Sequence, residues 1–376
     1  MLNKKFPVSG AMSSALGFGC MRLPTTNPDD AASIDEAEAI AMIRRAIDGG
    51  VKYIDTAYPY HNGASETLVG KALKDGYREK VLLATKLPLW KVETHEDMMA
   101  LLDEQLAKLQ VDYVDFYLLH AVARDRIEKM RKLDYKSFLD EAVRQGKIRY
   151  PSFSFHDDYA TFMDVLDDYP WAMCQVQMNI LDGENQATLK GIEEAGKRSI
   201  GVVVMEPLRG GLLAQPPAQV RKVYEDFPIH RSPVSWAFRY LYTMPQVITI
   251  LSGMSSMEQV EDNLRIFDEA AEEPLSAEET ALFAQVKETY DSCLRTRCTG
   301  CAYCQPCPKG VLIPRIFQGV DQAALRDGAS FREGYAQIVA EGGGAEHCVS
   351  CRKCEKLCPQ HLPIVDFLAS FRKELG

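Results

Sequence analysis

Eight of the eleven cysteines lie in two short runs in the last quarter of the 376-residue chain. The first run is Cys298-x2-Cys301-x2-Cys304-x2-Cys307-Pro308, and the second is Cys348-x2-Cys351-x2-Cys354-x3-Cys358-Pro359. Zinc sites generally take their ligands as two separated pairs. Three thiolates at steps of three, with a fourth just before a proline, are instead typical of a cubane [4Fe–4S] cluster. Two such runs supply eight thiolates and therefore predict two [4Fe–4S] clusters.

The pattern also predicts how the two runs share their ligands. The first three thiolates of a run hold one cluster, and the fourth reaches the neighbouring cluster. The first run has one residue fewer before its last cysteine, so the assignment of Cys307 is more open than that of Cys358. A single cluster, a cluster with a zinc ion, and disulfides are the alternatives. Disulfide scaffolds are short and spread their cysteines through the fold, unlike this chain. Cys293 lies outside both runs and is expected to be a buried or free thiol.

A second set of residues could deliver a proton. Asp55 and Tyr60 lie in YIDTAYPY, Lys86 ends LLATK, and His120 ends FYLLH. A free tyrosine has a pKa of about 10, and a nearby lysine ammonium is expected to lower the pKa of Tyr60. Asp55 would keep Lys86 charged and oriented, and His120 would hydrogen-bond the substrate oxygen. Such a group can protonate an oxygen that becomes an alkoxide as hydride reaches its carbon.

Each of these residues also has an ordinary structural explanation. Asp55 could cap a loop, Tyr60 could be a half-buried aromatic, Lys86 could lie on the surface, and His120 could be a core histidine. The functional interpretation depends on their shared position at the ends of three consecutive predicted strands.

The elements that would position these residues alternate between strands and helices over the first 270 residues. Apolar runs predict strands over Ala15–Cys20, Tyr53–Ala57, Val81–Lys86, Tyr113–His120, Ile148–Phe155, Met173–Asn179, Gly201–Pro207 and Val247–Gly253. Helices are predicted over Asp35–Asp48, Ser65–Leu73, Glu96–Leu109, Ile127–Gln145, Ala187–Lys197 and Ser232–Tyr242, and another starts in a capping box with Ser255 as N-cap and Glu258. This alternation predicts an α/β fold, a (β/α)8 TIM barrel with its chemistry at the carboxyl ends of the strands. A doubly wound sheet is the alternative, but no GxGxxG follows an early strand.

Composition and charge narrow the class of protein further. Hydrophobic residues make up 46% and charged residues 26% of the chain, which is typical of a globular protein. The net charge of −10 gives no indication of binding to nucleic acid or to a membrane, and no signal peptide is recognised. We therefore expect a cytoplasmic protein. We predict a barrel over residues 1–275, a connector helix over 276–295 that starts in a capping box of Ser276 and Glu279, and a small cluster domain over 296–376.

The motifs together resemble those of the aldo-keto reductases, which are (β/α)8 barrels. The resemblance covers about residues 1–270 and is carried by LGFGCMRLP, DTAYPYHNGASETLVGKAL, ATK, VDFYLLH, GKIRYPSFSFH and GVVVMEPLRGGLL. It implies that Asp55, Tyr60, Lys86 and His120 are a catalytic tetrad, with Tyr60 as the proton donor. It also implies hydride from NAD(P)H and a small carbonyl substrate. The cysteine region, including CTGCAYCQPCPKGVLIP, resembles the dicluster ferredoxin-like domains appended to some of these enzymes.

The resemblance further implies a nicotinamide site across the barrel mouth. Ser154 matches a residue that binds the carboxamide, and Gln175 matches a glutamine that assists it. Ser154 is followed by Phe155 and His156 where the family commonly has asparagine. Met205 stands where a ring-stacking aromatic is expected. Trp90, four residues after the lysine of the tetrad, could line the substrate pocket or pack at the barrel rim.

The predicted phosphate-binding region departs from the family pattern. The family often places Lys or Arg near the eighth strand to hold the adenosine 2′-phosphate, whereas this chain has Gly253, Ser255, Gln259 and Asn263. The departure leaves NADPH, NADH or another redox group open. Phosphates could still bind the backbone amides of the helix that follows. Arg209, after the seventh strand, could supply a positive charge or be a solvated loop residue.

Three functions fit these features. The first is a carbonyl reductase whose clusters exchange electrons with a ferredoxin-like partner. The second is the same enzyme with structural or oxygen-sensing clusters. The third is a non-catalytic, redox-responsive binding subunit, and the intact tetrad counts against it.

Overall fold

The computed structural model describes residues 1–298, 300–325 and 331–375. These residues form two compact units. The first comprises Met1–Pro207 and Phe238–Pro274, and the second comprises Leu208–Ala237 and Leu275–Gly376. The division predicted from the sequence placed the whole of residues 1–275 in the barrel, whereas the structure groups Leu208–Ala237 with the cysteine region.

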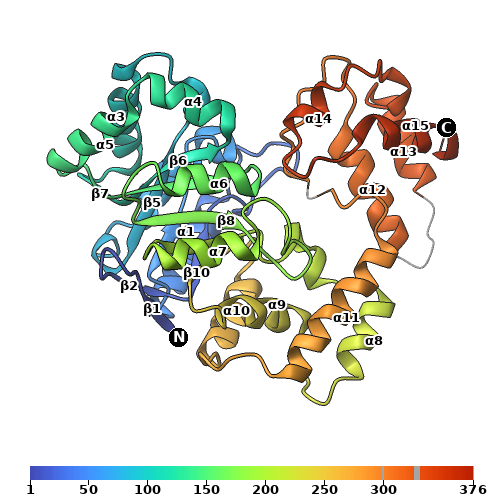
Figure 1. Cartoon of the computed structure of the whole chain (residues 1–376), viewed down its shortest axis with the longest axis horizontal. Coiled ribbons are helices and arrows are strands. Elements are labelled where there is room, and N and C mark those ends of the chain that lie inside the picture. The colour runs from blue at the N-terminus through green and yellow to red at the C-terminus, as the bar shows by residue number, and fades with distance from the viewer. Residues whose placement is uncertain (299, 326–330, 376) are drawn as a thin grey trace. The chain divides into compact units, whose positions relative to one another are not determined.

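The first unit is built on a closed parallel barrel (Figure 1). Its strands are β3 (Leu16–Gly19), β4 (Tyr53–Asp55), β5 (Leu82–Leu87), β6 (Val114–Val122), β7 (Ile148–Phe155), β8 (Met173–Gln177), β9 (Gly201–Met205) and β10 (Val247–Ser252). They follow one another in chain order around the barrel, which closes between β10 and β3. All eight predicted strands and the (β/α)8 barrel are therefore confirmed.

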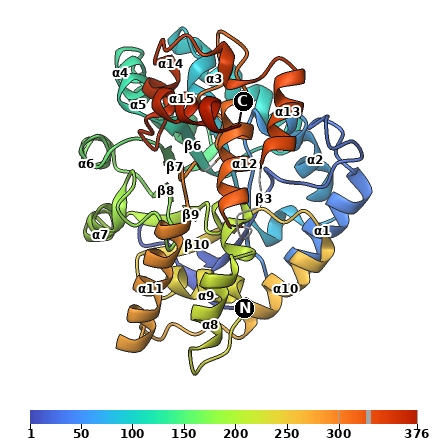
Figure 2. The same cartoon turned by 90° about the vertical axis from the view of Figure 1, so that its right-hand side faces the viewer.

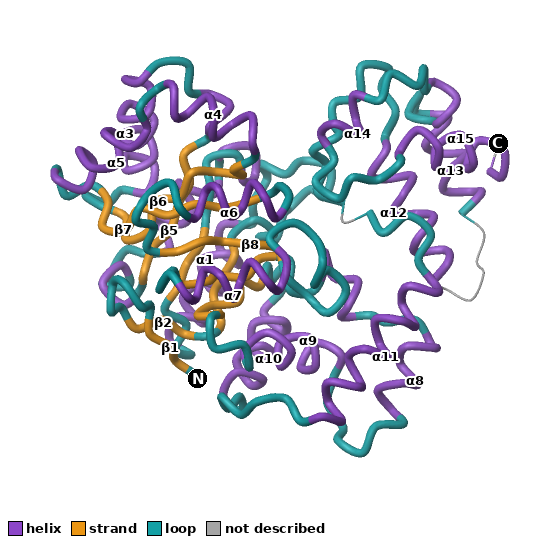
Figure 3. The backbone as a smooth tube through the Cα atoms, viewed as in Figure 1, coloured by secondary structure: helices purple, strands orange, loops and turns teal. Residues whose placement is uncertain are grey.

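Helices surround the strands of this unit. They are α1 (Glu36–Asp48), α2 (Ser65–Ala72), α3 (His95–Leu109), α4 (Arg124–Lys132), α5 (Tyr135–Arg144), α6 (Tyr159–Leu166), α7 (Thr188–Lys197) and α10 (Met257–Asp268). Figure 3 shows α3, α5 and α7 in purple outside the orange strands. The single helix predicted over Ile127–Gln145 is wrong, because Asp134 adopts a left-handed backbone (φ 54°) that separates α4 from α5. The N-cap of α10 is Ser256 rather than the predicted Ser255, since the Ser256 side chain accepts from the amide of Gln259.

An N-terminal hairpin closes one end of the barrel. Its strands β1 (Asn3–Lys5) and β2 (Met12–Ser14) pair antiparallel, and the sequence analysis did not predict them. Between them lies Phe6, which is fully buried. Its ring lies 4.7 Å from that of Phe116 and 6.2 Å from that of Tyr53, the first residue of β4. The amino-terminal end of the barrel is therefore filled by side chains, and the carboxyl ends of the strands remain for the chemistry.

The second unit combines α8 (Ala218–Glu225), the beginning of α9 (Pro233–Tyr242) and α11 (Ala277–Cys293) with the cysteine region. The packing of Trp236 explains why Leu208–Ala237 belongs to the second unit. Trp236 is fully buried, stacks on Tyr224 at 6.4 Å, and meets Phe283 of α11 edge-on at 5.9 Å. The predicted capping box of Ser276 and Glu279 starts α11 as expected.

The cysteine region has its own apolar core. Its helices are α12 (Ile313–Leu325), α13 (Arg332–Ala340), α14 (Lys353–Leu357) and α15 (Ile364–Leu375). Phe317 of α12 meets Phe367 and Phe371 of α15 edge-on, at 5.6 and 5.8 Å, and Figures 1 and 2 both show α12 beside α15. The expected short helices between the two cysteine runs are present, with residues 326–330 outside the described ranges. Within those ranges, no helix has the length and apolarity to cross a bilayer.

Candidate active site and cysteine sites

The residues of the predicted tetrad gather at the carboxyl ends of three neighbouring strands. Asp55 ends β4, Lys86 is the penultimate residue of β5, and His120 lies in the last third of β6. Tyr60 starts the 3-10 turn η1 (Tyr60–Gly63), which follows β4. Lys86 Nζ donates to both carboxylate oxygens of Asp55, at 2.7 and 2.6 Å, and to Tyr60 Oη at 3.1 Å. Lys86 therefore links the carboxylate to the phenol.

Two buried side chains that the sequence analysis missed support this arrangement. His61 in η1 accepts from the amide of Leu23 through Nε2, at 3.1 Å. Its Nδ1 lies 2.7 Å from the carbonyl oxygen of Ala31, so Nδ1 must carry the proton. Gln105 of α3 donates to the carbonyl oxygen of Lys86 at 3.0 Å and fixes the end of β5. Gln105 lies outside the motifs quoted above. His61 lies within DTAYPYHNGASETLVGKAL but was not singled out, because each of these residues acts through backbone groups that are distant in the sequence.

The Asp55–Lys86 pair is almost completely withdrawn from water, with side chains 2% and 1% exposed. Burial raises the pKa of Asp55, while the charge and hydrogen bonds of Lys86 and a hydrogen bond from Gln175 act in the opposite direction. A buried ion pair is costly to desolvate, and it persists when its hydrogen bonds are satisfied. Lys86 Nζ also lies 2.9 Å from the carbonyl oxygen of Thr56, so its three N–H groups are shared among four acceptors and none is left without a partner.

The pKa of Tyr60 moves in the direction opposite to the one expected from the sequence. Burial is the largest cause and raises the pKa of Tyr60 well above its ordinary value, and the negative charge of Asp55 raises it further. The prediction that Lys86 lowers this pKa failed because it treated the ammonium as an isolated charge. In the structure the bidentate contact with Asp55 offsets the charge of Lys86. The phenol therefore rests in its protonated, proton-donating form.

His120 faces the phenol across the same site. Its ring lies 6.2 Å from the Tyr60 ring, nearly perpendicular to it, and 5.1 Å from the half-exposed ring of Trp90. Burial, with the positive charge of Lys86, lowers the pKa of His120 well below its usual value, so the imidazole is neutral at pH 7. Its buried Nδ1 has no hydrogen-bond partner among the described residues. A neutral ring with one open nitrogen can bind a substrate oxygen, and the contact of Trp90 with this ring is compatible with either role predicted for Trp90.

The residues predicted to bind the nicotinamide lie on adjacent strands. Ser154 of β7 and Gln175 of β8 are register partners, and Met205 ends β9. Gln175 Nε2 lies 3.8 Å from Met205 Sδ, while the buried Gln175 Oε1 has no partner in the described part of the chain. Ser154 Oγ accepts from the amide of Ala121 at 2.8 Å. The open acceptor of Gln175 suits the N–H groups of a carboxamide, so these residues fit the group that the family implies.

The predicted phosphate-binding residues are partly engaged with one another. Ser255 donates its amide to Gln259 Oε1 at 2.8 Å, and its hydroxyl donates to the carbonyl oxygen of Arg22 at 2.8 Å. Asn263 is buried and donates to Ser252 Oγ at 2.9 Å, so its amide supports the end of β10.

Arg22 is a basic residue that the sequence analysis missed at this position. Its Cβ, Cγ and Cδ each lie 3.4 Å from the place that a Cβ would take on Gly253, so the missing side chain of Gly253 leaves room for it. Arg22 follows β3, and β3 pairs with β10 where the barrel closes. The sequence next to the eighth strand has no basic residue, but the aliphatic part of the Arg22 side chain reaches Gly253 through space.

Arg209 has a different environment from the one predicted. It lies in the second unit, is buried, and donates from Nη2 to the carbonyl oxygen of Arg297 at 2.5 Å. This contact holds the chain immediately before the first cysteine run. It gives no support to the prediction that Arg209 binds the cofactor.

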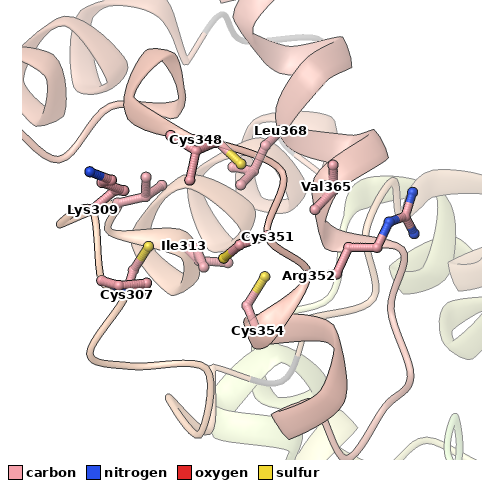
Figure 4. A pocket seen from close by; sticks show the side chains of 12 residues that line it. Cys307, Lys309, Ile313, Cys348, Cys351, Arg352, Cys354, Val365 and Leu368 are labelled. Carbon is pink, nitrogen blue, oxygen red and sulfur yellow. The ribbon is translucent and has the colours of Figure 1, made fainter.

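The cysteines form two groups of four, each around its own hollow. The first cysteine site is lined by Cys298, Cys301, Cys304 and Cys358. The second cysteine site is lined by Cys307, Cys348, Cys351 and Cys354, and their sulfur atoms turn toward a common space (Figure 4). Each site thus takes three thiols from one run and the last thiol from the other, which is the shared arrangement expected from the spacing. Cys293 lies outside both groups as a half-buried free thiol.

The two cysteine sites are alike in size and share a wall. The hollows measure about 330 and 340 Å³, open solvent included, and Ile313 lines both. In the described part of the chain, no three Cys, His, Asp or Glu side chains are arranged to hold a single metal ion. Four thiols around a hollow of this kind fit a multi-iron cluster, which needs a thiolate at each of its corners.

Comparison with known proteins agrees with both parts of this structure. The family model for the aldo/keto reductase family matches residues 15–288, and a model for 4Fe-4S dicluster domains matches residues 297–362. The chain belongs to the aldo/keto reductase family. It is therefore an NAD(P)H-dependent oxidoreductase that carries a C-terminal 4Fe-4S domain.

Individual relatives match the barrel rather than the whole chain. An uncharacterized oxidoreductase, YqkF, of Bacillus subtilis is 25% identical over 300 residues, which cover 70% of this chain and 90% of that protein. L-galactose dehydrogenase of Arabidopsis thaliana is 28% identical over 278 residues, covering 68% of this chain and 85% of that one. The structure of aldo-keto reductase AKR11C1 from Bacillus halodurans in its holo form superposes with a TM-score of 0.64 at 27% identity, covering 76% of this chain and 96% of that one.

Proposed function

We propose that this aldo/keto reductase, acting in the cytoplasm, reduces the carbonyl group of a small aldehyde or ketone. Asp55, Tyr60, Lys86 and His120 are the catalytic residues in this proposal. The eight cysteines hold two [4Fe–4S] clusters that exchange single electrons with a ferredoxin-like protein partner. The observation that supports the catalytic part best is the contact of Lys86 Nζ with both the buried Asp55 and the partly exposed Tyr60.

The proposed reaction divides the work between hydride and proton. A reduced nicotinamide held by Gln175 and Ser154 would supply the hydride, leaving as the oxidised nicotinamide, so that a C–H bond could form at the carbonyl carbon as the carbon–oxygen π bond breaks. Tyr60 transfers its hydroxyl proton to the oxygen that receives the π electrons, which gives an alcohol and a phenolate. The ammonium of Lys86, 3.1 Å away, stabilises that phenolate. The neutral His120 donates a hydrogen bond to the same substrate oxygen and so stabilises its developing charge.

Gln175, Ser154 and Met205 would hold the nicotinamide end of the cofactor, and Gly253 and Ser255 would lie near its phosphates. The buried, unpartnered Oε1 of Gln175 supports the first assignment. Arg22, which packs over Gly253, supports the second by supplying a positive charge.

Replacement of Tyr60 by phenylalanine tests the catalytic proposal. Tyr60→Phe should lower kcat for carbonyl reduction by about 10²- to 10⁴-fold, because it removes a positioned general acid. Nicotinamide binding, followed by quenching of protein fluorescence, should be nearly unchanged. The matched control is Tyr58→Phe, which removes the hydroxyl that accepts from Lys91 at 2.9 Å in the same loop. A Tyr60→Phe enzyme that keeps more than about a tenth of the wild-type rate would exclude this role.

A structural role for the clusters is the second candidate, and the packing of the thiols favours it. The apolar core of the cysteine region packs against several of them: Cys298, Cys304, Cys307, Cys348 and Cys354. Stopped-flow absorbance during anaerobic turnover separates the two roles. Bleaching of the cluster bands within one turnover supports electron exchange. Clusters that stay oxidised through many turnovers, with NADH, NADPH and a reduced ferredoxin each tried as donor, support the structural role.

A further inference from the structure

The two cysteine sites differ in the charge and exposure of their surroundings. The first site is lined by uncharged residues, among them Phe317 and Leu362, and its Cys358 is buried. The lining of the second site includes Lys309 and Arg352, both exposed. Its Cys351 is exposed as well. The second site therefore has two cations and an exposed thiol in its lining, whereas the first is lined by uncharged side chains.

Exposed cations continue from the second site onto α14. Lys353 and Lys356 lie three residues apart, so they share one side of that helix. Exposed apolar side chains accompany them, with Val349 59% exposed and Leu357 47% exposed. We call this surface the cationic face; it comprises Lys309, Val349, Arg352, Lys353, Lys356 and Leu357.

The positive charge of the cationic face is not cancelled by its own carboxylates. Glu355 and Asp366 approach Arg352, at 3.0 and 3.9 Å. One oxygen of Glu355 is also taken by the amide of Val365 at 2.9 Å. The three lysines of the face form no ion pair with any carboxylate in the described ranges. The side chains of the face thus carry a positive surplus on a chain whose net charge is −10.

We propose that the cationic face is the docking site of an acidic one-electron carrier protein, which exchanges electrons with the cluster of the second cysteine site. Complementary charge speeds and orients the encounter of such proteins, and the exposed Val349 and Leu357 supply apolar contact once the carrier is bound. The proposal rests on the electron-transfer function proposed above. In each encounter one electron leaves the reduced carrier and one enters the cluster, and no bond forms, no bond breaks and no proton moves.

The overall charge favours a protein carrier over a nucleic acid or a membrane. Both of those alternatives present a dense array of negative charge, which an acidic chain would approach against long-range repulsion. A small acidic protein can instead cover this limited patch. The negative groups of such a carrier need to approach this chain only at the cationic face.

The test compares two charge reversals in the full-length protein, with its clusters assembled under anaerobic conditions. Lys353→Glu/Lys356→Glu reverses the cationic face. Arg372→Glu/Lys373→Glu, in the last turn of α15, makes the same change of net charge elsewhere in the cysteine region. The probe is a reduced acidic ferredoxin, and reduced methyl viologen is the small donor that needs no docking. Iron and sulfide counts verify that each variant holds its clusters, and the single variant Lys309→Glu replaces Lys353→Glu/Lys356→Glu if that variant does not.

At low ionic strength, Lys353→Glu/Lys356→Glu should lower the second-order rate of cluster reduction by ferredoxin at least tenfold. The Arg372→Glu/Lys373→Glu control should change the rate less than threefold. The difference should disappear at about 0.5 M salt, where charges are screened beyond a few ångströms. Reduction by methyl viologen should not slow in either variant.

Equal slowing of both variants would show that net charge, and not the cationic face, controls the rate, and would overturn the proposal. Unchanged rates in both would overturn it as well. Loss of binding to anionic vesicles in Lys353→Glu/Lys356→Glu, with no loss of ferredoxin rate, would assign the face to a membrane instead. If methyl viologen reduces the wild-type clusters and ferredoxin does not, docking fails while redox-active clusters stand. If no donor reduces them, the proposed electron-transfer function fails first.

Discussion

The barrel site and the cysteine sites are organised by different forces. In the barrel, side chains position one another: Lys86 is held by Asp55, by Tyr60 and by a backbone carbonyl, all within 3.1 Å. In the cysteine sites, four thiols surround a hollow, and the nearest side chains are largely apolar. The barrel therefore prepares its charges before any ligand binds, whereas the cysteine sites need a cluster to give their thiols a common partner.

The protonation of the two sites shows the same contrast. Burial raises the pKa of Cys298 and Cys304 to about 12, and that of Cys354 to about 11. At pH 7 these thiols would be neutral, and iron must displace their protons to be bound. The buried carboxylate of the barrel, by comparison, has the ammonium of Lys86 beside it. We expect the cysteine region to depend on its clusters for stability far more than the barrel depends on its cofactor.

Removal of single thiols should produce the largest effect and should test the shared arrangement. Cys351→Ala should lower the iron content from about eight to about four per chain, because the second site loses its cluster. Cys307 lines that same site. The double variant Cys307→Ala/Cys351→Ala should therefore lose no more iron than Cys351→Ala alone.

The matched double variant is Cys301→Ala/Cys351→Ala, which removes one thiol from each site and should abolish both clusters. Iron and acid-labile sulfide counts on anaerobic protein measure these outcomes. If Cys307→Ala/Cys351→Ala also lost both clusters, Cys307 would belong to the first site, and the grouping described above would be wrong. Carbonyl reduction should survive in Cys351→Ala, since the barrel strands lie in the other unit.

Breaking the ion pair of the barrel should have the next largest effect. Lys86→Met should lower the free energy of unfolding of the barrel by about 3–5 kcal/mol, because it leaves the carboxylate of Asp55 buried without its cation. The double variant Asp55→Asn/Lys86→Met removes both charges and should recover part of this loss. Chemical unfolding followed by near-UV circular dichroism measures it. Lys91→Met, at an exposed lysine, is the control and should be close to wild type.

Two histidines of the barrel unit, His120 and His156, predict a smaller effect that appears with acid. Burial lowers the pKa of His156 to about 4 and that of His120 well below 6.5. Since the unfolded chain binds these protons more readily, the stability contributed by both histidines is complete above pH 6.5. It is lost progressively as the pH falls from about 6.5 toward 4.

For His156 this loss amounts to at most about 3–4 kcal/mol, at about 1.4 kcal/mol for each pKa unit. The free energy of unfolding of His156→Gln should therefore depend less steeply on pH between 6.5 and 4 than that of the wild type. His95→Gln, at an exposed histidine, should leave the slope unchanged. An identical slope in His156→Gln and wild type would contradict the lowered pKa of His156.

The sequence was sufficient for features that depend on spacing along the chain. The strand and helix alternation predicted the barrel, and the cysteine intervals predicted two groups of four thiols. Features that depend on contacts between residues distant in the sequence were missed. Phe6 fills the barrel from a hairpin with no strong periodicity, and Leu208–Ala237 joins the second unit through the packing of Trp236 on α11. The pKa of Tyr60 was predicted in the wrong direction, because burial depends on the complete fold.

Arg22 illustrates this limit and gives the last and smallest predicted effect. The chain around the eighth strand has no basic residue, so the local sequence argued against a charged contact with the cofactor phosphates. Closure of the barrel brings the loop after β3 against Gly253, and with it an exposed arginine.

If Arg22 contacts a phosphate, Arg22→Ala should raise the Kd for the nicotinamide dinucleotide about tenfold, since one charged hydrogen bond contributes roughly 1.5–3 kcal/mol before solvent screening. The loss should shrink as salt rises, and kcat should stay near the wild-type value because Tyr60 is untouched. Fluorescence titration with NADPH and NADH measures the Kd values, and Arg45→Ala, at an arginine paired with Glu261, is the control. A larger loss for NADPH than for NADH would place Arg22 at the 2′-phosphate, whereas equal losses would place it at the pyrophosphate. Unchanged Kd values for both dinucleotides would show that Arg22 does not contact a phosphate, and would leave the backbone amides of α10 as the phosphate-binding groups.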